Sequence, residues 1–200
     1  MSLNELAYWD NRYKSGGNSG FGSSGIIRDW KWKIIEAYVP IIDDVVDVGC
    51  GDLQFWQGRD CKKYIGIDIS PTIITKNTYV KPYWKFICGN AKDYFKNIQG
   101  EVVLCIDLLY HIRQLQDFIA IVENLVKYTK KWLFIYTLIT NPYRPVTSDD
   151  VYQFYRPLGR VQTLLEKELI LMSYSRNPYH PIAGFYVFLR KPLEEIPHAL

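Results

Sequence analysis

The chain of 200 residues is long enough for one domain with a hydrophobic core of its own. Its hydrophobic share of 48% and charged share of 22% are ordinary for a soluble globular protein, and we find neither an apolar run of the roughly 18 residues that cross a bilayer nor a signal peptide. The formal net charge of +3 is scattered rather than gathered in a dense basic patch, which disfavours a dedicated nucleic-acid-binding protein.

Residues 1–25 are predicted to form a helix and a loop ahead of the periodic part of the chain. The loop is the glycine- and serine-rich stretch SGGNSGFGSSG, Ser15–Gly25, which has too few apolar side chains to order itself by burial. Apolar residues at helical spacing then predict a helix over Ile26–Val39, which ends at Pro40.

Apolar runs and helical patterns alternate through the rest of the chain. Ser70 followed by Pro71 is typical of a helix start, because serine caps the first turn and proline fits its first position. In chain order the predicted elements are strands at Asp44–Val48 and Lys63–Ile69, a helix from Pro71 to about Tyr79, strands at Tyr83–Cys88 and Glu101–Asp107, a helix at Gln114–Thr129, a strand at Lys131–Ile139, a helix near Leu158–Lys167, and strands at Glu168–Ser175 and Ala183–Arg190.

This order of elements predicts an α/β fold with a doubly wound, mostly parallel sheet of seven strands. The early strands are apolar throughout, as in a parallel sheet that helices cover on both faces. The last two strands follow each other without a full helix between them, which predicts an antiparallel hairpin at one edge. Ligands of such sheets bind beyond the carboxyl ends of the strands, so the loops after Val48, Ile67, Cys88 and Ile106 should line one crevice.

The loop after the first strand reads DVGCGDL, with glycines at positions 49 and 51. Glycine lets the backbone turn sharply and approach a ligand closely. A dinucleotide-binding loop of the GxGxxG type would place a third glycine or alanine at Gln54, which here follows the bulky Leu53. The missing glycine argues against a dinucleotide and indicates a ligand without a pyrophosphate.

Polar residues follow the next three strands. Asp68 stands at the end of the second strand, where a carboxylate can accept hydrogen bonds from both hydroxyls of a ribose; the alternative is a solvated surface aspartate. Asn90 can pair with the exocyclic amine and a ring nitrogen of adenine, but asparagine also suits a tight turn after glycine. Asp107 and His111 follow the most apolar strand and should lie at the crevice.

Four stretches, in this order and spacing, resemble the successive motifs of the class I S-adenosylmethionine-dependent methyltransferases: VVDVGCGD, YIGIDIS, FICGNAKD and VVLCIDLLYHI. The N-terminal YWDNRYKSGGNSGFGSSG also resembles the segment that precedes the first motif in a bacterial and viral subgroup of these enzymes. The resemblance implies a Rossmann-like methyltransferase fold that extends to about Arg190, with S-adenosylmethionine as the cofactor.

The same resemblance implies a set of cofactor-binding residues. Asp68 would bind the ribose, Asn90 would face the adenine amine, and Asp107 would lie near the methionine end. The full set is Asp47, Gly49, Cys50 and Gly51 in the first loop, Asp68 and Ile69 in the second, Asn90 and Ala91 in the third, and Asp107 and Leu108 in the fourth.

We expect methyl transfer to a small-molecule acceptor that the sequence does not identify. Catalysis of this reaction rests on holding the acceptor near the methyl group, and His111 and Asp107 are the candidate catalytic residues, with His111 as the general base. The alternative for His111 is a cap or a packing residue at the start of the next helix. Three other functions stay open: methylation of RNA or protein with a partner subunit, a non-catalytic binding or scaffold protein that keeps the fold, and a nicotinamide-dependent dehydrogenase.

The four cysteines form no CxxC pair, and we expect them to be small core residues in a reducing compartment: Cys50, Cys61, Cys88 and Cys105. No closely spaced set of cysteine and histidine ligands predicts a zinc site. We therefore expect a cytoplasmic protein with no bound metal, no membrane partner and no nucleic-acid partner. Nothing in the sequence predicts its oligomeric state.

The glycine-rich stretch is predicted to be a mobile lid. We expect it to fold over the bound cofactor, to exclude water and to complete the acceptor site, with Phe21 covering an apolar face. The alternative is a disordered N-terminal loop.

Overall fold

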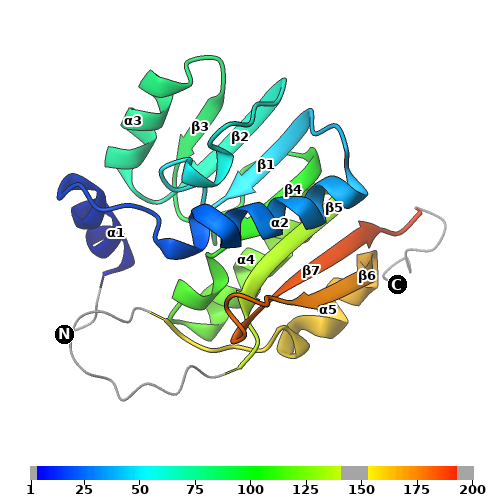
Figure 1. The fold of residues 1–200 in the computed structure, drawn as a ribbon. Helices are drawn as coiled ribbons and strands as arrows, with labels where there is room; N and C mark the ends of the chain where they lie inside the picture. Colours follow the sequence, from blue (N-terminus) through cyan, green and yellow to red (C-terminus); the bar gives the residue numbers. More distant parts are fainter. Residues whose placement is uncertain (1–3, 141–152, 193–200) are drawn as a thin grey trace.

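The computed structural model describes residues 4–140 and 153–192. Its centre is a seven-stranded sheet with the order β3-β2-β1-β4-β5-β7-β6 (Figure 1). The strands are β1 Asp44–Val48, β2 Lys63–Asp68, β3 Lys85–Cys88, β4 Gly100–Ile106, β5 Thr129–Leu138, β6 Leu169–Arg176 and β7 Ala183–Arg190. Strands β1 to β5 run parallel, whereas β7 is antiparallel to both of its neighbours, β5 and β6. The predicted fold class is confirmed, including the hairpin at the edge.

Helices cover both faces of this sheet (Figure 1). They are the α-helices α1 Glu5–Lys14, α2 Gly25–Tyr38, α3 Pro71–Val80, α4 Leu115–Tyr128 and α5 Gln162–Glu168, and the 3₁₀ helices η1 Phe21–Ser23, η2 Gln54–Trp56, η3 Leu109–His111 and η4 Leu158–Val161. Helix α2 packs on one face through Trp32 and Ile35, and α4 packs on the other through Phe118 and Leu125. None of the helices in the described ranges has both the length and the apolar composition that a membrane crossing requires.

The central strand β4 supplies both apolar cores. Val103 and Cys105 belong to the cluster under α4, while Val102, Leu104 and Ile106 belong to the cluster under α2. All five side chains are buried, and this alternation is the period of two that a strand imposes. The two-sided burial of β4 explains why its sequence is apolar throughout.

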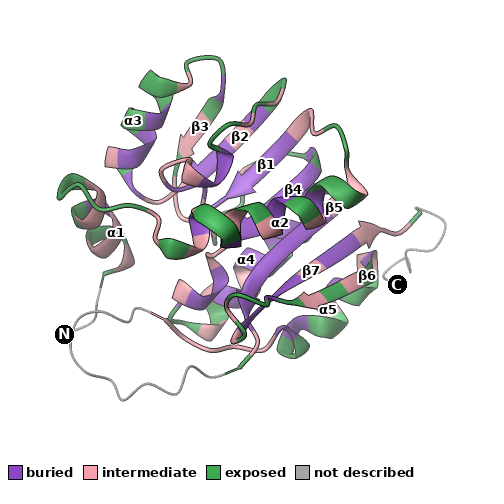
Figure 2. Cartoon of the chain, viewed as in Figure 1, coloured by how far each residue is buried: buried purple, intermediate pink, exposed green. Residues whose placement is uncertain are grey.

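Helix α1 contributes to neither of these clusters. Its residues are mostly exposed or half-buried, as the pink and green of α1 in Figure 2 show, and its one buried residue is Asp10. No residue of α1 belongs to either apolar cluster. This helix is therefore held by polar contacts rather than by the hydrophobic core.

Several strand ends differ from the predicted ones by one or two residues, and two of these differences have clear local reasons. β3 begins two residues late, because the N–H of Trp84 donates to a carbonyl three residues back and closes a turn that leaves Tyr83 98% exposed. β4 ends before Asp107, since Asp107 has a φ of +62°, in the left-handed region that strand residues do not adopt. The predicted start of α3 is confirmed, with the Ser70 Oγ accepting from the N–H of Ile73.

Candidate functional site

A pocket opens at the carboxyl ends of β1, β2 and β4, where the order of the sheet reverses. It encloses about 870 Å³ of empty space, its open mouth included. All of the residues predicted for the site line this pocket: Asp47, Gly49, Cys50, Gly51, Asp68, Ile69, Asn90, Ala91, Asp107, Leu108 and His111. The fold thus brings the four predicted loops together around one cavity.

The loop after β1 depends on its two glycines. Gly49 and Gly51 have φ values of +80° and +53°, in the left-handed region that glycine adopts without strain. The N–H groups of Gly49 and Cys50 both donate to the carbonyl of Ile67, at 2.8 and 3.1 Å, which holds the turn against β2. A Cβ on Gly51 would lie only 2.2 Å from the Oγ of Ser19. Glycine at this position therefore lets the N-terminal segment pack directly on the loop.

Asp68, at the end of β2, has a carboxylate that the backbone holds in place. Its Oδ2 accepts from the N–H of Gly51 at 3.0 Å, and its Oδ1 accepts from the N–H of Ser70 at 2.9 Å. Burial raises the pKa of Asp68 to about 6, although these backbone hydrogen bonds oppose the rise. The side chain is half-buried and oriented, unlike the solvated aspartate that was the alternative. Each oxygen keeps a further lone pair for a ligand.

Asp47 holds the aromatic residues behind the first loop. Its Oδ2 accepts from the Nε1 of Trp56 and from the hydroxyl of Tyr64, both at 2.8 Å. The side chain is 4% exposed, and burial raises its pKa to about 6. Asp47 therefore shapes the pocket from behind, by fixing these two rings.

Asp107 and His111 lie together at the end of β4. Both carboxylate oxygens of Asp107 accept hydrogen bonds, Oδ1 from the hydroxyl of Tyr110 at 2.8 Å and Oδ2 from the Nζ of Lys31 at 2.5 Å. The His111 ring packs edge-on against Trp9, with the ring centroids 4.8 Å apart. His111 thus has the packing contact that was its alternative role, and it also lines the pocket.

Asn90 combines the two roles that were predicted as alternatives. Its Oδ1 accepts from the N–H of Lys92 at 3.1 Å, which is the tight-turn arrangement. The same side chain lines the pocket, and its NH₂ group is a separate donor. Asn124 fixes this third loop by donating to the carbonyl of Ala91 at 3.0 Å.

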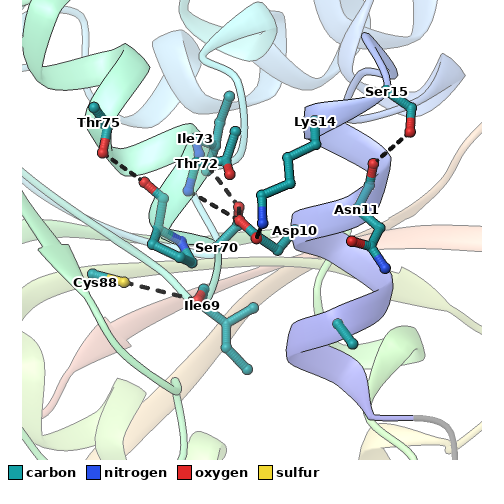
Figure 3. A network of polar contacts seen from close by, with 12 residues as sticks. Asp10, Asn11, Lys14, Ser15, Ile69, Ser70, Thr72, Ile73, Thr75 and Cys88 are labelled. Carbon is teal, nitrogen blue, oxygen red and sulfur yellow. Dashed lines mark hydrogen bonds and ion pairs between the residues drawn. The ribbon is translucent and has the colours of Figure 1, made fainter.

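One wall of the pocket comes from α1, through Glu5, Trp9 and Tyr13. On its other side this helix binds the start of α3 (Figure 3). The Oδ1 of Asp10 accepts from the Oγ of Ser70 at 2.7 Å and from the N–H of Thr72 at 3.0 Å, and its Oδ2 pairs with Lys14 at 2.7 Å. The hydrogen bonds from Lys14, Thr72 and Ser70 hold the pKa of Asp10 well below its usual range.

The glycine-rich segment lies along the first loop. The Oγ of Ser19 donates to Asp52 at 2.7 Å and accepts from the N–H of Asp52 at 3.0 Å, and the N–H of Ser19 donates to the same carboxylate at 3.1 Å. Ser19 and Ser23 line the pocket. The side chain of Phe21 is 75% exposed and is not among the lining residues, so its covering of an apolar face over the bound cofactor stays a prediction. The rings of Trp9 and Tyr13 provide the aromatic faces of the pocket.

Sequence reasoning missed lining residues that include Glu5, Ser19 and Ser23. It also missed Lys31 and Asp52, which do not line the pocket but bind residues that do. A signal for Lys31 was present, since it stands between Ile27 and Ile35 at a spacing of four on the apolar stripe of α2. A charge at such a position needs a buried partner. The contact between Ser19 and Asp52 spans 33 residues, and no local pattern indicates it.

Comparison with known proteins agrees with this geometry. Residues 46–131 match the family model described as a methyltransferase domain. The chain is similar in structure to the N-methyltransferase NodS from Bradyrhizobium japonicum WM9 in complex with S-adenosyl-L-homocysteine, with a TM-score of 0.71 and 12% identity over 95% of this chain and 100% of that one. A search of curated proteins found no match.

Two further solved structures are similar. One is magnesium protoporphyrin IX methyltransferase (ChlM) from Synechocystis PCC 6803, with a TM-score of 0.66 and 14% identity over 93% of this chain and 97% of that one. The other is CalS10, an amino pentose methyltransferase from Micromonospora echinaspora, with a TM-score of 0.65 and 13% identity over 96% and 99%. At these identities the likeness is one of fold.

The matched domain runs from β1 to the start of β5, so it contains all four loops that the sequence singled out. The TM-scores, over more than nine tenths of each chain, show that the fold is shared with the similar structures. Residues 46–131 of the chain thus match a methyltransferase domain, and its fold is the one shared by solved methyltransferases.

Proposed function

We propose that the protein transfers the methyl group of S-adenosylmethionine to a small-molecule acceptor. The observation that carries the proposal is the convergence of four loops on one pocket, within a chain that matches a methyltransferase domain. Two of the similar structures are named for small-molecule acceptors, a magnesium protoporphyrin and an amino pentose, which supports an acceptor of this kind.

The charges of the pocket suit this cofactor better than a dinucleotide. None of the described residues that line the pocket is a lysine or an arginine, so a pyrophosphate would meet no cationic side chain there. The rings of Trp9 and Tyr13 line it, and aromatic faces attract a sulfonium cation. The lining carboxylates act in the same direction: Glu5, Asp47, Asp68 and Asp107.

Each loop then has a proposed role toward the cofactor. Asp68 accepts hydrogen bonds from the ribose hydroxyls, with the lone pairs that Gly51 and Ser70 leave free. Asn90 pairs with the adenine edge through the groups that its turn contact leaves available. Gly49 and Gly51 let the backbone approach the ligand.

When bound, S-adenosylmethionine supplies a methyl group that is activated for displacement by its sulfonium. The chain itself contributes position and the exclusion of water, because α1 and residues 15–25 lie along the pocket. His111 is placed in the wall where it can take a proton from the acceptor. We assign Asp107 a positioning role rather than that of the base, since both of its oxygens are already hydrogen-bonded.

A thermal-shift titration tests the proposal. S-adenosylmethionine and S-adenosylhomocysteine should each stabilise the protein, by about 2.7 kcal/mol at a hundredfold excess over the dissociation constant, because a ligand of the native state shifts unfolding by mass action. A nicotinamide dinucleotide is the matched control and should have no effect. Stabilisation by the dinucleotide alone would refute the assignment. Labelled cofactor offered to pools of metabolites would then identify the acceptor.

The role of His111 has its own test. His111→Ala should leave the affinity for S-adenosylhomocysteine nearly unchanged and should lower turnover by roughly 10²–10⁴-fold, the usual contribution of a general base. Calorimetry measures the first quantity and labelled methyl transfer the second. If the variant no longer binds the ligand, the contact with Trp9 is the main role of His111 and the base lies elsewhere.

A further inference from the structure

A fully buried lysine lies behind the pocket and binds two of the segments that form its wall. Lys31 of α2 is 0% exposed. Its Nζ donates to the Oδ2 of Asp107 at 2.5 Å and to the carbonyl oxygen of Gly22 at 2.9 Å, and it lies 3.7 Å from the centroid of the Tyr136 ring. A buried ammonium is costly unless such partners compensate its lost hydration. The three contacts therefore show which parts of the protein depend on Lys31.

The carboxylate that Lys31 contacts is itself constrained. Asp107 has a left-handed φ of +62°, which is unfavourable for a residue other than glycine and persists only where neighbours hold it. Tyr110 holds the other oxygen of the carboxylate, at 2.8 Å. Tyr136, under the Lys31 ammonium, is fixed in turn by Asn177, which donates to its hydroxyl at 2.8 Å. The ammonium and the carboxylate thus have set positions.

The glycine-rich segment rests directly on this ion pair. A Cβ on Gly22 would lie 2.9 Å from both carboxylate oxygens of Asp107, so the backbone at Gly22 packs against the carboxylate. The next residue, Ser23, is buried and lines the pocket. Lys31 therefore contacts both Asp107, in the pocket wall, and the segment beside it.

We propose that Lys31 is a positioning residue for methyl transfer, which fixes the Asp107 carboxylate and fastens residues 15–25 over the pocket through the carbonyl of Gly22. The inference rests on the proposed function, because it assumes that the pocket binds the cofactor. When residues 15–25 lie over the pocket, the carbonyl of Gly22 accepts a hydrogen bond from the Lys31 ammonium. The affinity of a ligand that binds only under this segment therefore depends on the ion pair between Lys31 and Asp107.

The rival explanation is that Lys31 and Asp107 only stabilise the fold. Three variants separate the two: Lys31→Met, the double variant Lys31→Met/Asp107→Asn, and the control Lys33→Met, which removes an exposed lysine from the same helix. The double variant matters because Lys31→Met alone leaves a buried carboxylate unpaired, which is strongly destabilising, whereas removal of both charges is much better tolerated.

The measurements are the melting temperature, the affinity for S-adenosylhomocysteine and the rate of chymotrypsin cleavage after Phe21, with and without saturating ligand. Phe21 is 75% exposed, so the protease reaches its side chain and the rate reports the mobility of the backbone around it. In the wild type and in Lys33→Met, the ligand should slow cleavage. In both variants that lack Lys31, this protection should fall by roughly tenfold or more, the factor expected for a hydrogen bond from a charged donor.

The double variant decides between the two explanations. A positioning role predicts that it regains the melting temperature of the wild type and still lacks protection at Phe21. A purely structural role predicts that it regains both, and this result would overturn the inference, as would protection equal to the wild type in Lys31→Met. If the wild type binds no S-adenosylhomocysteine, the proposed function fails. The ligand-free cleavage rates would still test Lys31, and equal rates with and without it would refute its contact with the segment.

Discussion

The carboxylate of Asp68 accepts hydrogen bonds from the protein backbone and, in our proposal, also from the ligand. Two backbone N–H groups orient it, and the residue lines the pocket. Asp68→Ala should weaken the binding of S-adenosylhomocysteine by roughly 1.5–3 kcal/mol, the scale of a hydrogen bond to a charged group. Asp68→Asn should cost less, because it keeps one acceptor. Calorimetry measures both, and equal affinity for the wild type and Asp68→Ala would exclude the ribose contact.

The raised pKa of Asp68 predicts a pH dependence with opposite signs for stability and binding. Burial raises this pKa to about 6 in the folded protein, whereas the unfolded chain loses the proton near pH 4. The folded state therefore binds more protons between these values, and the stability of the ligand-free protein falls as the pH rises across that window. Ligand affinity should instead rise through about pH 6, because the ionised carboxylate is the stronger acceptor.

Asp68→Asn is the control for both pH trends. Asp47 also has a pKa raised to about 6, chiefly by burial and also by the charge of Asp68, and it still titrates in the variant. The part of each slope that disappears in Asp68→Asn therefore belongs to Asp68 and to its coupling with Asp47. Affinities measured from about pH 5 to about pH 7 that rise equally in both proteins would show that Asp68 does not contact the ligand.

At the scale of elements, the carboxylate of Asp10 is one of the groups that attach α1 to the rest of the fold. Asp10 accepts hydrogen bonds from Ser70 and Thr72 at the start of α3, the helix that follows the Asp68 loop (Figure 3). Because the pKa of Asp10 is lowered in the folded protein, its contribution to stability is complete above the unfolded pKa of about 4 and is lost progressively as the pH falls from there through the lowered folded pKa.

Asp10→Asn should loosen α1 by roughly 1.5–3 kcal/mol at neutral pH, since the charge-assisted hydrogen bonds are lost. The rate of chymotrypsin cleavage after Tyr13 measures the change. Asp29→Asn is the matched control, because Asp29 is 51% exposed and its pair with Arg28 on the surface should contribute less than about 1 kcal/mol. Unchanged cleavage in Asp10→Asn would show that other contacts hold α1.

The elements that could be predicted from sequence are those with local signals. β1 and β7 occur at the predicted bounds, because an apolar run between turn residues is sufficient to mark a buried strand. The two glycines of the first loop indicated its sharp turn, because glycine adopts a left-handed φ without strain. Leu53 shows the limit: it has a left-handed φ of +62°, which its residue type does not indicate, and the N–H of Trp56 donates to its carbonyl at 2.9 Å.

The contacts that could not be predicted join distant parts of the chain. Lys31 and Asp107 are 76 residues apart, and Ser19 and Asp52 are 33 apart. Which carboxylate meets the buried ammonium depends on how α2 crosses the sheet, and periodicity does not specify that crossing. The residues that the four strand-end loops bring to the pocket were therefore predicted one by one, while the N-terminal side of the pocket was predicted only as a segment.

On the scale of the whole molecule, the free energy of local opening should differ between the core and the N-terminal residues. The two apolar clusters lie on the two faces of the sheet and include residues of α2, α4 and the central strands. Residues 4–24 contribute to neither cluster. Their contacts with the rest of the fold include those of Asp10 and Ser19, the packing of Trp9 on His111, and the hydrogen bond from Lys31 to Gly22. Elements with few buried apolar contacts open at lower free energy than the core.

Native-state hydrogen exchange should show this division directly. In the ligand-free protein, the amides of α1 should exchange through local opening, at a free energy well below that of global unfolding, whereas those of β4 and β5 should require global unfolding. Helix α4 is the internal control, because it packs in the core through Phe118 and Leu125. Saturating S-adenosylhomocysteine should slow exchange in α1 more than in α4, since Trp9 and Tyr13 of α1 line the pocket. If α1 already exchanges as slowly as β4 without ligand, the N-terminal unit is a fixed part of the fold and not a lid.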